Sequence, residues 1–405
     1  MRNRLRKGWI ASCLVCLVLA VTSSVWAERP IRILLTDPLS GPVKELGEKF
    51  LYGIQLAVDE VNAQGGVLDR KVEVVAEDSQ TKPDIAVRKA QKHLLEGSVD
   101  IACAGLGTPV AKAMKDLTKQ YNILFIDYAM SDESTGKEFA YHSIRLVYNT
   151  SMLARTLVSY VAKNTQFKKI YLLNQDYSYG RDMAAAIKRE IARQIPAAEI
   201  VGEDYPPFLS KDFSPFLSKI QASNADCIMT ANWGTDISVL MKQRKELGIK
   251  AVVVNNALAN PTVISEFPDA AQGSIVCDAY MVTVNTPESI DFVNRWQEKY
   301  KSTPYPKPDC TSTRTYIGTK FLLEGIKKAG SVEVKKLIPA LEGMHQKSLN
   351  GEIYLRACDH QLQSPLPVAV INTETYPYVG VPAMIAASDI AIEESAIDNP
   401  RCNKK

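Results

Sequence analysis

The sequence predicts an α/β protein made of two similar units, each with a parallel sheet covered by helices on both faces. Three observations predict this class. Short strand-like runs alternate with segments of helical periodicity, and the links between them are short, as in parallel sheets with crossover helices. The same alternation restarts after about residue 150. The chain has 405 residues, 46% of them apolar, which suits two lobes of roughly 150–200 residues each better than one domain.

The first unit begins just after residue 30. Its first helix is indicated by apolar residues that recur at helical spacing from Leu46 to Val61 and stop at Gly65-Gly66, a helix-stop signal. By the same criteria the expected strands are 31–36, 72–76, 99–104 and 123–127, and the expected helices are 46–61, 84–95 and 110–120.

The second unit repeats this pattern and ends near residue 278. Pro215 falls in the first turn of its third helix, where proline is favoured. The expected helices are 152–163, 180–194, 213–223 and 236–247, and the expected strands are 169–174, 199–205, 226–231 and 251–255.

The remaining segment is too short to form a third unit, so we expect it to complete the first two. It contains a Pro-rich loop at 304–308 and a polar tail that includes Cys402. Its expected helices are 287–300, 315–329 and 334–341, and its expected strand is 368–371.

The first 27 residues are predicted to be a signal peptide. Four basic residues at 2–7 precede an apolar stretch at 9–21 that is too short to span a membrane, and Val25-Trp26-Ala27 has the character of a cleavage site. We expect cleavage after this tripeptide and a periplasmic mature chain that begins at Glu28. An uncleaved anchor is the alternative, which the short apolar stretch disfavours.

The charge of the mature chain excludes a nucleic-acid partner from the expected functions. The whole sequence has 48 Lys and Arg residues against 45 Asp and Glu residues, a net charge of +3. Four of the basic residues belong to the predicted signal peptide, which leaves 44 against 45 and a net charge of −1. No basic excess remains to bind a phosphate backbone.

Six of the eight cysteines lie in the mature chain. Three occur in apolar strand-like runs and are expected to be small buried hydrophobes: Cys103, Cys227 and Cys277. Cys310, Cys358 and Cys402 lie in polar, loop-like sequence, and we predict a disulfide between Cys358 and Cys402 that holds the C-terminal tail. Cys310 is the competing partner for either, and three free thiols are the alternative in a poorly oxidising envelope. No Cys or His spacing is that of a zinc site, so no metal is expected.

Sequence motifs of catalysis are absent. The chain has no P-loop, no HExxH, no GxSxG elbow and no GxGxxG after a predicted strand. An exported hydrolase would need an activated nucleophile, and no Ser or Cys has a local context for one. We therefore expect a protein that is not an enzyme and that needs no cofactor.

The loops that follow predicted strands carry the candidate binding residues. Ligands of open α/β sheets lie beyond the carboxyl ends of the strands. After strand 99–104, Thr108 has the character of an N-cap and Pro109 that of the first helical residue. A helix that starts here can bind a carboxylate or amide oxygen without Arg or Lys. A capped helix with no ligand explains this loop equally well.

Three further loops have the same character. They combine small polar residues with aromatics, and they are 128–132, 174–180 and 232–235. Core packing would explain one such aromatic. Because two loops of this kind belong to each unit, they favour a ligand cleft between the units.

Five stretches of the chain carry a family resemblance. They are Leu39-Ser40-Gly41-Pro42, Asp59-Glu60-Val61-Asn62-Ala63-Gln64-Gly65-Gly66-Val67, Asp176-Tyr177-Ser178-Tyr179-Gly180, Asp212-Phe213-Ser214-Pro215-Phe216 and Arg356-Ala357-Cys358-Asp359-His360-Gln361. With them, nearly the whole mature chain resembles the periplasmic solute-binding proteins of ABC importers, of the leucine/isoleucine/valine-binding type.

The resemblance implies a type 1 periplasmic binding protein clamshell, in which three crossovers join two Rossmann-like lobes. One lobe combines 28–148 with 279–355, and the other combines 149–278 with 356–405, including the tail. The resemblance also implies a monomer that captures a small-molecule solute, closes around it and docks on a membrane permease. The ATPase subunits of an ABC importer would then be further partners, and no bond in the solute is made or broken.

The family's ligand contacts fall on eight positions of this chain. They are Gly107 and Thr108 for the ligand carboxylate, Ala129 and Ser131 for the α-amino and carboxylate groups, Tyr179 and Trp233 as aromatics of the second lobe, and Leu46 and Asn256.

Two of these positions depart from the leucine-binding pattern. Leu46 stands near an aromatic position of the family, and Asn256 stands near the acidic residue that pairs with the ligand ammonium. A buried ammonium without a partner is costly, and Asp37 or Asp127 is an alternative source of the charge. We predict a preference for a solute with a carboxylate or amide and an apolar or aromatic body. Zwitterionic, leucine-like amino acids are expected to bind less well.

The alternative function is a ligand-sensing receptor of the same fold, which relays its occupancy to a partner protein. Such receptors usually carry a membrane helix and an intracellular module, whereas this chain ends in a polar tail.

Overall fold

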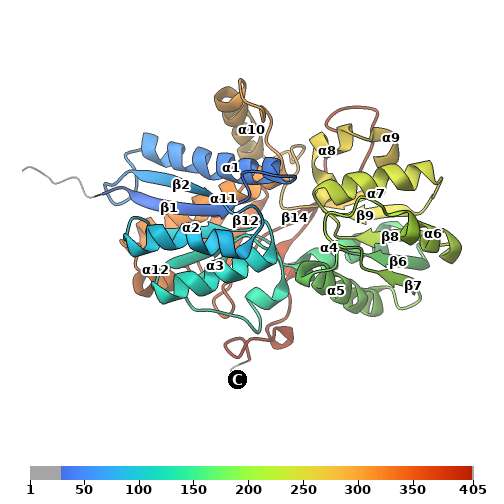
Figure 1. Ribbon diagram of the computed structural model, residues 1–405, viewed down its shortest axis with the longest axis horizontal. Helices are drawn as coiled ribbons and strands as arrows, with labels where there is room; N and C mark the ends of the chain where they lie inside the picture. Colours follow the sequence, from blue (N-terminus) through green and yellow to red (C-terminus); the bar gives the residue numbers. More distant parts are fainter. Residues whose placement is uncertain (1–28, 404–405) are drawn as a thin grey trace, which may run out of the picture.

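The computed structural model describes residues 29–403, and the predicted signal peptide lies outside them. Two lobes lie side by side, each built around its own sheet (Figure 1). Within residues 29–403, no helix combines the length and the apolar character needed to cross a membrane.

The first lobe contains a five-stranded parallel sheet in the order β2–β1–β3–β4–β5. Along β1, Ile33 and Leu35 pack on one face and Leu34 on the other, and all three are buried. Both faces are therefore covered, as a parallel sheet requires. The strands are β1 (Ile31–Asp37), β2 (Val72–Asp78), β3 (Ile101–Ala104), β4 (Leu124–Asp127) and β5 (Ser143–Arg145), and the last of these was not expected.

Helices cover both faces of this sheet. Helices α2 (Pro83–Leu95) and α3 (Thr108–Gln120) pack against each other on one face. On the other, α1 (Lys44–Ala63) packs against α11 (Cys310–Ala329), which joins the lobe from late in the sequence. Gly53 allows the two helices to approach closely, since a Cβ added there would lie 2.0 Å from the Ser312 carbonyl oxygen.

The second lobe contains a seven-stranded sheet in the order β15–β14–β10–β9–β8–β6–β7. Its strands from β6 to β10 are parallel, as predicted, but the sheet is mixed because β14 pairs antiparallel with both β10 and β15. The strands are β6 (Lys169–Leu173), β7 (Glu199–Asp204), β8 (Cys227–Thr230), β9 (Val252–Asn255), β10 (Ile275–Cys277), β14 (Leu366–Val370) and β15 (Ala383–Ile385). Its helices are α4 (Thr150–Asn164), α5 (Ser178–Gln194), α6 (Ser214–Ser223), α7 (Thr235–Glu246), α8 (Pro261–Ser265), α9 (Pro268–Ala271) and α13 (Ala387–Ile390).

A small antiparallel sheet that the sequence did not reveal extends the late segment of the first lobe. Its strands are β11 (His345–Ser348), β12 (Gly351–Leu355) and β13 (Leu362–Gln363), preceded by α10 (Pro287–Tyr300) and α12 (Val334–Leu341). Strand β11 is polar and none of its residues is fully buried, so it has no apolar pattern by which to recognise it. Short 3-10 turns are η1 (Asp132–Ser134), η2 (Ala257–Ala259) and η3 (Glu394–Ala396).

The C-terminal segment contacts both lobes. Strands β14 and β15 belong to the second sheet. Further along, the Asn399 side chain donates to the Thr135 carbonyl oxygen at 3.0 Å, and Arg401 pairs with Glu342 at 2.7 Å. The resemblance places residues 356–405 in the second lobe, but the described part of this segment ends against the first lobe (Figure 1).

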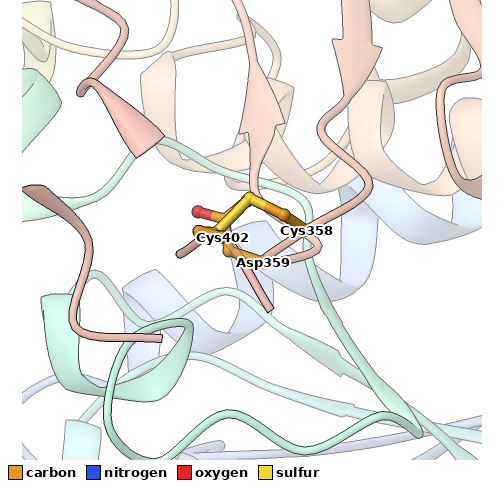
Figure 2. Close-up of side chains that lie close together, drawn as sticks. All are labelled: Cys358, Asp359 and Cys402. Atoms are coloured by element: carbon orange, nitrogen blue, oxygen red, sulfur yellow. A yellow bond between two sulfur atoms is a disulfide. The ribbon is translucent and has the colours of Figure 1, made fainter. Parts of the chain in front are cut away.

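A disulfide joins Cys358 to Cys402, with Cα atoms 4.9 Å apart, and Figure 2 shows it beside Asp359. The two sulfurs and the Asp359 carboxylate lie within 4.8 Å of one another, like metal ligands. However, a disulfide leaves no thiolate to bind a metal, and the Asp359 carboxylate accepts two hydrogen bonds from Arg356 at 2.7 and 2.9 Å. We therefore interpret the two cysteines and Asp359 as a structural disulfide with a neighbouring ion pair, not as a metal site.

Cys310 is a buried free thiol, as are Cys103, Cys227 and Cys277. Its assignment to a polar loop is wrong, because α11 begins at Cys310, five residues earlier than expected. The reason is a capping box: the Asp309 side chain accepts the Ser312 backbone N–H at 2.9 Å, and the Ser312 hydroxyl accepts the Asp309 backbone N–H at 3.0 Å.

Candidate functional site

A cavity of about 390 Å³ lies between the two lobes. Its walls contain seven of the eight positions predicted for ligand contact. From the first lobe these are Leu46, Gly107, Thr108 and Ala129, and from the second they are Tyr179, Trp233 and Asn256. The strand-end loops of both units therefore meet at one site.

The loop after β3 forms part of the first-lobe wall. Helix α3 begins at Thr108, and the capping position is Gly107 rather than Thr108. Gly107 has φ of 107°, a conformation that favours glycine. The Thr108 side chain makes no capping hydrogen bond in this helix. Its hydroxyl is therefore free to contact a solute in the cavity.

Asp37 fixes the backbone of the loop after β3 through two hydrogen bonds. It lies at the end of β1 with no exposed surface, and its Oδ1 accepts the backbone N–H groups of Gly105 at 3.1 Å and Leu106 at 2.8 Å. Burial raises the pKa of Asp37 to about 7, and the nearby Asp127 carboxylate adds to the increase. Asp37 does not line the cavity, so its role is to position the loop.

Asp127 and Ser131 also lie outside the cavity wall. Asp127 Oδ1 accepts the Ala129 N–H at 2.8 Å, and its other oxygen pairs with Arg145 at 3.3 Å. The Ser131 hydroxyl donates to Asp182 on α5, in the second lobe. Neither Asp37 nor Asp127 is thus placed to meet a solute ammonium, and the Ser131 hydroxyl links the two lobes outside the cavity wall.

Aromatic side chains form the second-lobe wall. The Trp233 indole N–H donates to the Tyr177 hydroxyl at 2.6 Å, and Phe208 packs against the Trp233 ring at a centroid distance of 5.1 Å. The Tyr179 hydroxyl donates to Asn256 Oδ1 at 3.3 Å. These contacts fix the ring orientations, so the wall offers a preformed apolar surface with polar edges.

Gly180 is required for the turn that presents Tyr177 and Tyr179. A Cβ added there would lie 2.0 Å from the Gln175 carbonyl oxygen, so the start of α5 must move in the Gly180→Ala variant. We expect Gly180→Ala to lower the free energy of unfolding by roughly 1–3 kcal/mol, measured by urea denaturation. Gly380→Ala is the control, because no atom lies within 4 Å of its added Cβ. Equal stability of the two variants would contradict the prediction.

In the described part of the chain, the sequence analysis missed all five charged side chains that line the cavity, which are Glu45, Lys242, Glu266, Asp278 and Arg314. Arg314 on α11 and Asp278, directly after β10, lie 3.3 Å apart across the junction of the lobes. Burial lowers the pKa of Arg314, but the Asp278 carboxylate and the other acidic groups nearby together outweigh this effect, so the pKa is raised. Asp278 follows a buried strand, which is the signal that identified the other loops. Arg314 has no comparable signal, since it is placed by the packing of α11.

Comparison with known proteins places this architecture in context. A family model described as periplasmic binding protein matches residues 30–375. The chain is 24% identical over 387 residues to Leu/Ile/Val-binding protein homolog 4 of Brucella abortus, which covers 90% of each protein.

Two solved structures have the same fold. The leucine-, isoleucine-, valine-, threonine- and alanine-binding protein of Brucella ovis, in a closed conformation, has a TM-score of 0.82 at 24% identity, covering 90% of this chain and 97% of that one. A solute-binding protein of an ABC transporter from Rhodopseudomonas palustris, in complex with 3,4-dihydroxybenzoic acid, has a TM-score of 0.79 at 22% identity, covering 92% and 99%. These likenesses confirm the two-lobed α/β fold predicted from the sequence.

Proposed function

Because the chain belongs to the periplasmic binding protein family, we propose that it captures a small solute between its lobes and delivers it to the permease of an ABC importer. The observation that carries this proposal is the shared cavity of about 390 Å³, to which both lobes contribute strand-end loops. Volumes of this size are typical of small-molecule sites. The solute leaves unchanged, since the role is capture and release.

We propose that the solute has a carboxylate or amide and an apolar or aromatic body. On the first-lobe side, the N-terminus of α3 and the Thr108 hydroxyl suit an anionic or carbonyl oxygen. On the second-lobe side, Trp233 and Tyr179 suit a flat or branched apolar body, with Leu46 from the first lobe. The neighbour from Rhodopseudomonas palustris holds an aromatic acid, and the one from Brucella ovis is named for amino acids.

Calorimetry with matched pairs tests the solute class. Leucine is compared with 4-methylpentanoate, its analogue without the amino group, and phenylalanine with 3-phenylpropanoate. We expect the acids without the amino group to bind more tightly, because Asn256 provides no charge for an ammonium. The three carboxylates that line the cavity, on Glu45, Glu266 and Asp278, are each already paired with a Lys or Arg side chain. Tight binding of leucine together with no binding of 4-methylpentanoate would overturn the proposed solute class.

Thr108→Val is expected to weaken binding of the preferred acid by roughly ten- to a hundredfold, because a hydrogen bond to a charged group contributes about 1.5–3 kcal/mol. The change keeps the shape of the side chain and removes its hydroxyl. Thr375→Val, at an exposed position outside the cavity wall, is the matched control. Affinities that differ by less than about twofold between the two variants would remove Thr108 from the site.

Delivery is tested separately from capture. A sensor of the same fold would bind the solute equally well, whereas a transport protein is needed for its uptake. We expect cells that lack this protein to lose high-affinity uptake of the labelled solute and to regain it when the protein is restored. Normal uptake without the protein would favour the sensing alternative.

A further inference from the structure

Asp278 and Arg314 form a buried ion pair in the wall of the cavity. The side chain of Asp278 is 1% exposed and that of Arg314 is 10% exposed. One guanidinium nitrogen, Nη2, approaches both carboxylate oxygens, at 3.3 and 3.4 Å. These distances are longer than the 2.7–2.9 Å of well-formed ion pairs.

A second buried pair in this protein shows the contrast. Arg356 and Asp359 are joined through two nitrogens and two oxygens at 2.7 and 2.9 Å, beside the disulfide and away from the cavity. The geometry of that pair is the one expected where the purpose is structural. The looser pair in the cavity wall leaves hydrogen-bonding capacity on both partners.

The remaining capacity can be assigned to particular atoms. Arg314 Nε donates to the Cys310 carbonyl oxygen at 3.3 Å. Among the residues that the structure describes, its third nitrogen, Nη1, has no hydrogen-bond partner. Asp278 Oδ1 accepts the Tyr148 hydroxyl at 2.9 Å and the Ala279 N–H at 2.6 Å, so it is well supplied. Of the donors Tyr148, Ala279 and Arg314, only Arg314 contacts Oδ2. A carboxylate oxygen can accept more than one hydrogen bond, so Oδ2 can accept another from a solute.

The pair is close to electrically neutral as a unit. The groups around it are Tyr148, Tyr179 and the Cys310 thiol, together with the Asp309 carboxylate. Burial raises the pKa of the two tyrosines and of the thiol, so these three groups carry no charge at neutral pH. The Asp309 charge is balanced by Lys49, which lies 2.8 Å away. A solute that carries a further charged group beside its carboxylate would therefore have that group attracted by one member of the pair and repelled by the other at short range.

We infer that Asp278 and Arg314 form a subsite for an uncharged polar group on the solute that both donates and accepts a hydrogen bond, such as a hydroxyl. The group donates to Asp278 Oδ2 and accepts from Arg314. This inference rests on the proposed function, since it identifies the group that the same solute carries at the end remote from its carboxylate. A carboxylate at this place is repelled by Asp278, an ammonium is repelled by Arg314, and a methyl group leaves both partners unsatisfied.

A set of benzoates that differ only at the 4-position tests the inference by calorimetry. The probes are 4-methylbenzoate, 4-hydroxybenzoate and terephthalate, which carry a methyl group, a hydroxyl and a second carboxylate. With the wild-type protein we expect 4-hydroxybenzoate to bind roughly ten- to a hundredfold more tightly than either of the others.

Two variants make the test specific for the pair. Asp278→Asn removes the carboxylate that repels the second carboxylate of terephthalate, and it leaves the Arg314 charge uncompensated. The affinity for terephthalate relative to 4-hydroxybenzoate therefore rises by about tenfold or more. Asp278→Asn combined with Arg314→Gln is neutral and keeps a donor and an acceptor, so this gain disappears. Glu394→Gln, an exposed position on η3, is the control for a change in net charge. Circular dichroism confirms that each variant is folded.

The outcomes separate the two proposals. Equal affinity of the wild type for the methyl and hydroxyl probes overturns the subsite and leaves the proposed function intact. If Asp278→Asn strengthens 4-methylbenzoate as much as terephthalate, Arg314 is the carboxylate anchor and the inference is wrong. If none of the benzoates binds the wild type, the aromatic-acid class fails and the inference fails with it.

Discussion

Replacing Cys402 with serine is expected to lower the free energy of unfolding by about 4 kcal/mol, the loop-entropy value for a bridge whose two ends are 44 residues apart. The Cys358–Cys402 bond closes a segment that includes β13, β14 and β15, so its loss also releases the end that Asn399 and Arg401 hold against the first lobe. Denaturant unfolding of the variant and the wild type measures the difference.

Reductant provides the internal control for this prediction. Wild-type protein with the disulfide reduced should fall to the stability of Cys402→Ser, and the variant itself should not respond to reductant. The four buried thiols do not take part, because each is free in the folded protein. A variant within about 1 kcal/mol of the oxidised wild type would show that the bridge does little for stability.

Asp37→Asn is expected to flatten the dependence of stability on pH. Because burial raises the pKa of Asp37 from 3.8 to about 7, the folded protein holds a proton between these values that the unfolded chain has released. Stability contributed by this group is therefore lost as the pH rises from about 4 to about 7, and it stays lost above that. The loss amounts to roughly 2–4 kcal/mol in the wild type.

Denaturant unfolding at pH 5 and pH 8 measures this effect. The asparagine keeps an acceptor oxygen for the Gly105 and Leu106 N–H groups but does not titrate. Burial also raises the pKa of Asp182 and of Asp236 to about 6, so a smaller slope of the same sign persists in the variant. Glu298→Gln, an exposed position on α10, is the control and should keep the wild-type slope. An unchanged slope in Asp37→Asn would mean that Asp37 is ionised in the folded protein throughout.

The sequence by itself determined the elements whose signal is local. Strand β3 is a continuous apolar run, β1 contains the apolar run 33–35, and α1 carries its periodicity from Leu46 to Val61 before a glycine stop. Both patterns arise because each element buries its own surface, so they can be recognised without knowing the partner. The loops at the carboxyl ends of these strands followed from the same patterns, and seven of the eight predicted positions line one cavity.

Only the tertiary structure decided which distant segments meet. The antiparallel strands β14 and β15 join the second sheet although about 90 residues separate β10 from β14, and the polar strand β11 is stabilised by its neighbour β12. Asp278 and Arg314 come together in the cavity because β10 and α11 belong to different lobes that pack against each other. Contacts of this kind leave no periodic trace in the sequence, because their free energy depends on burial and charge pairing that exist only after the chain has folded.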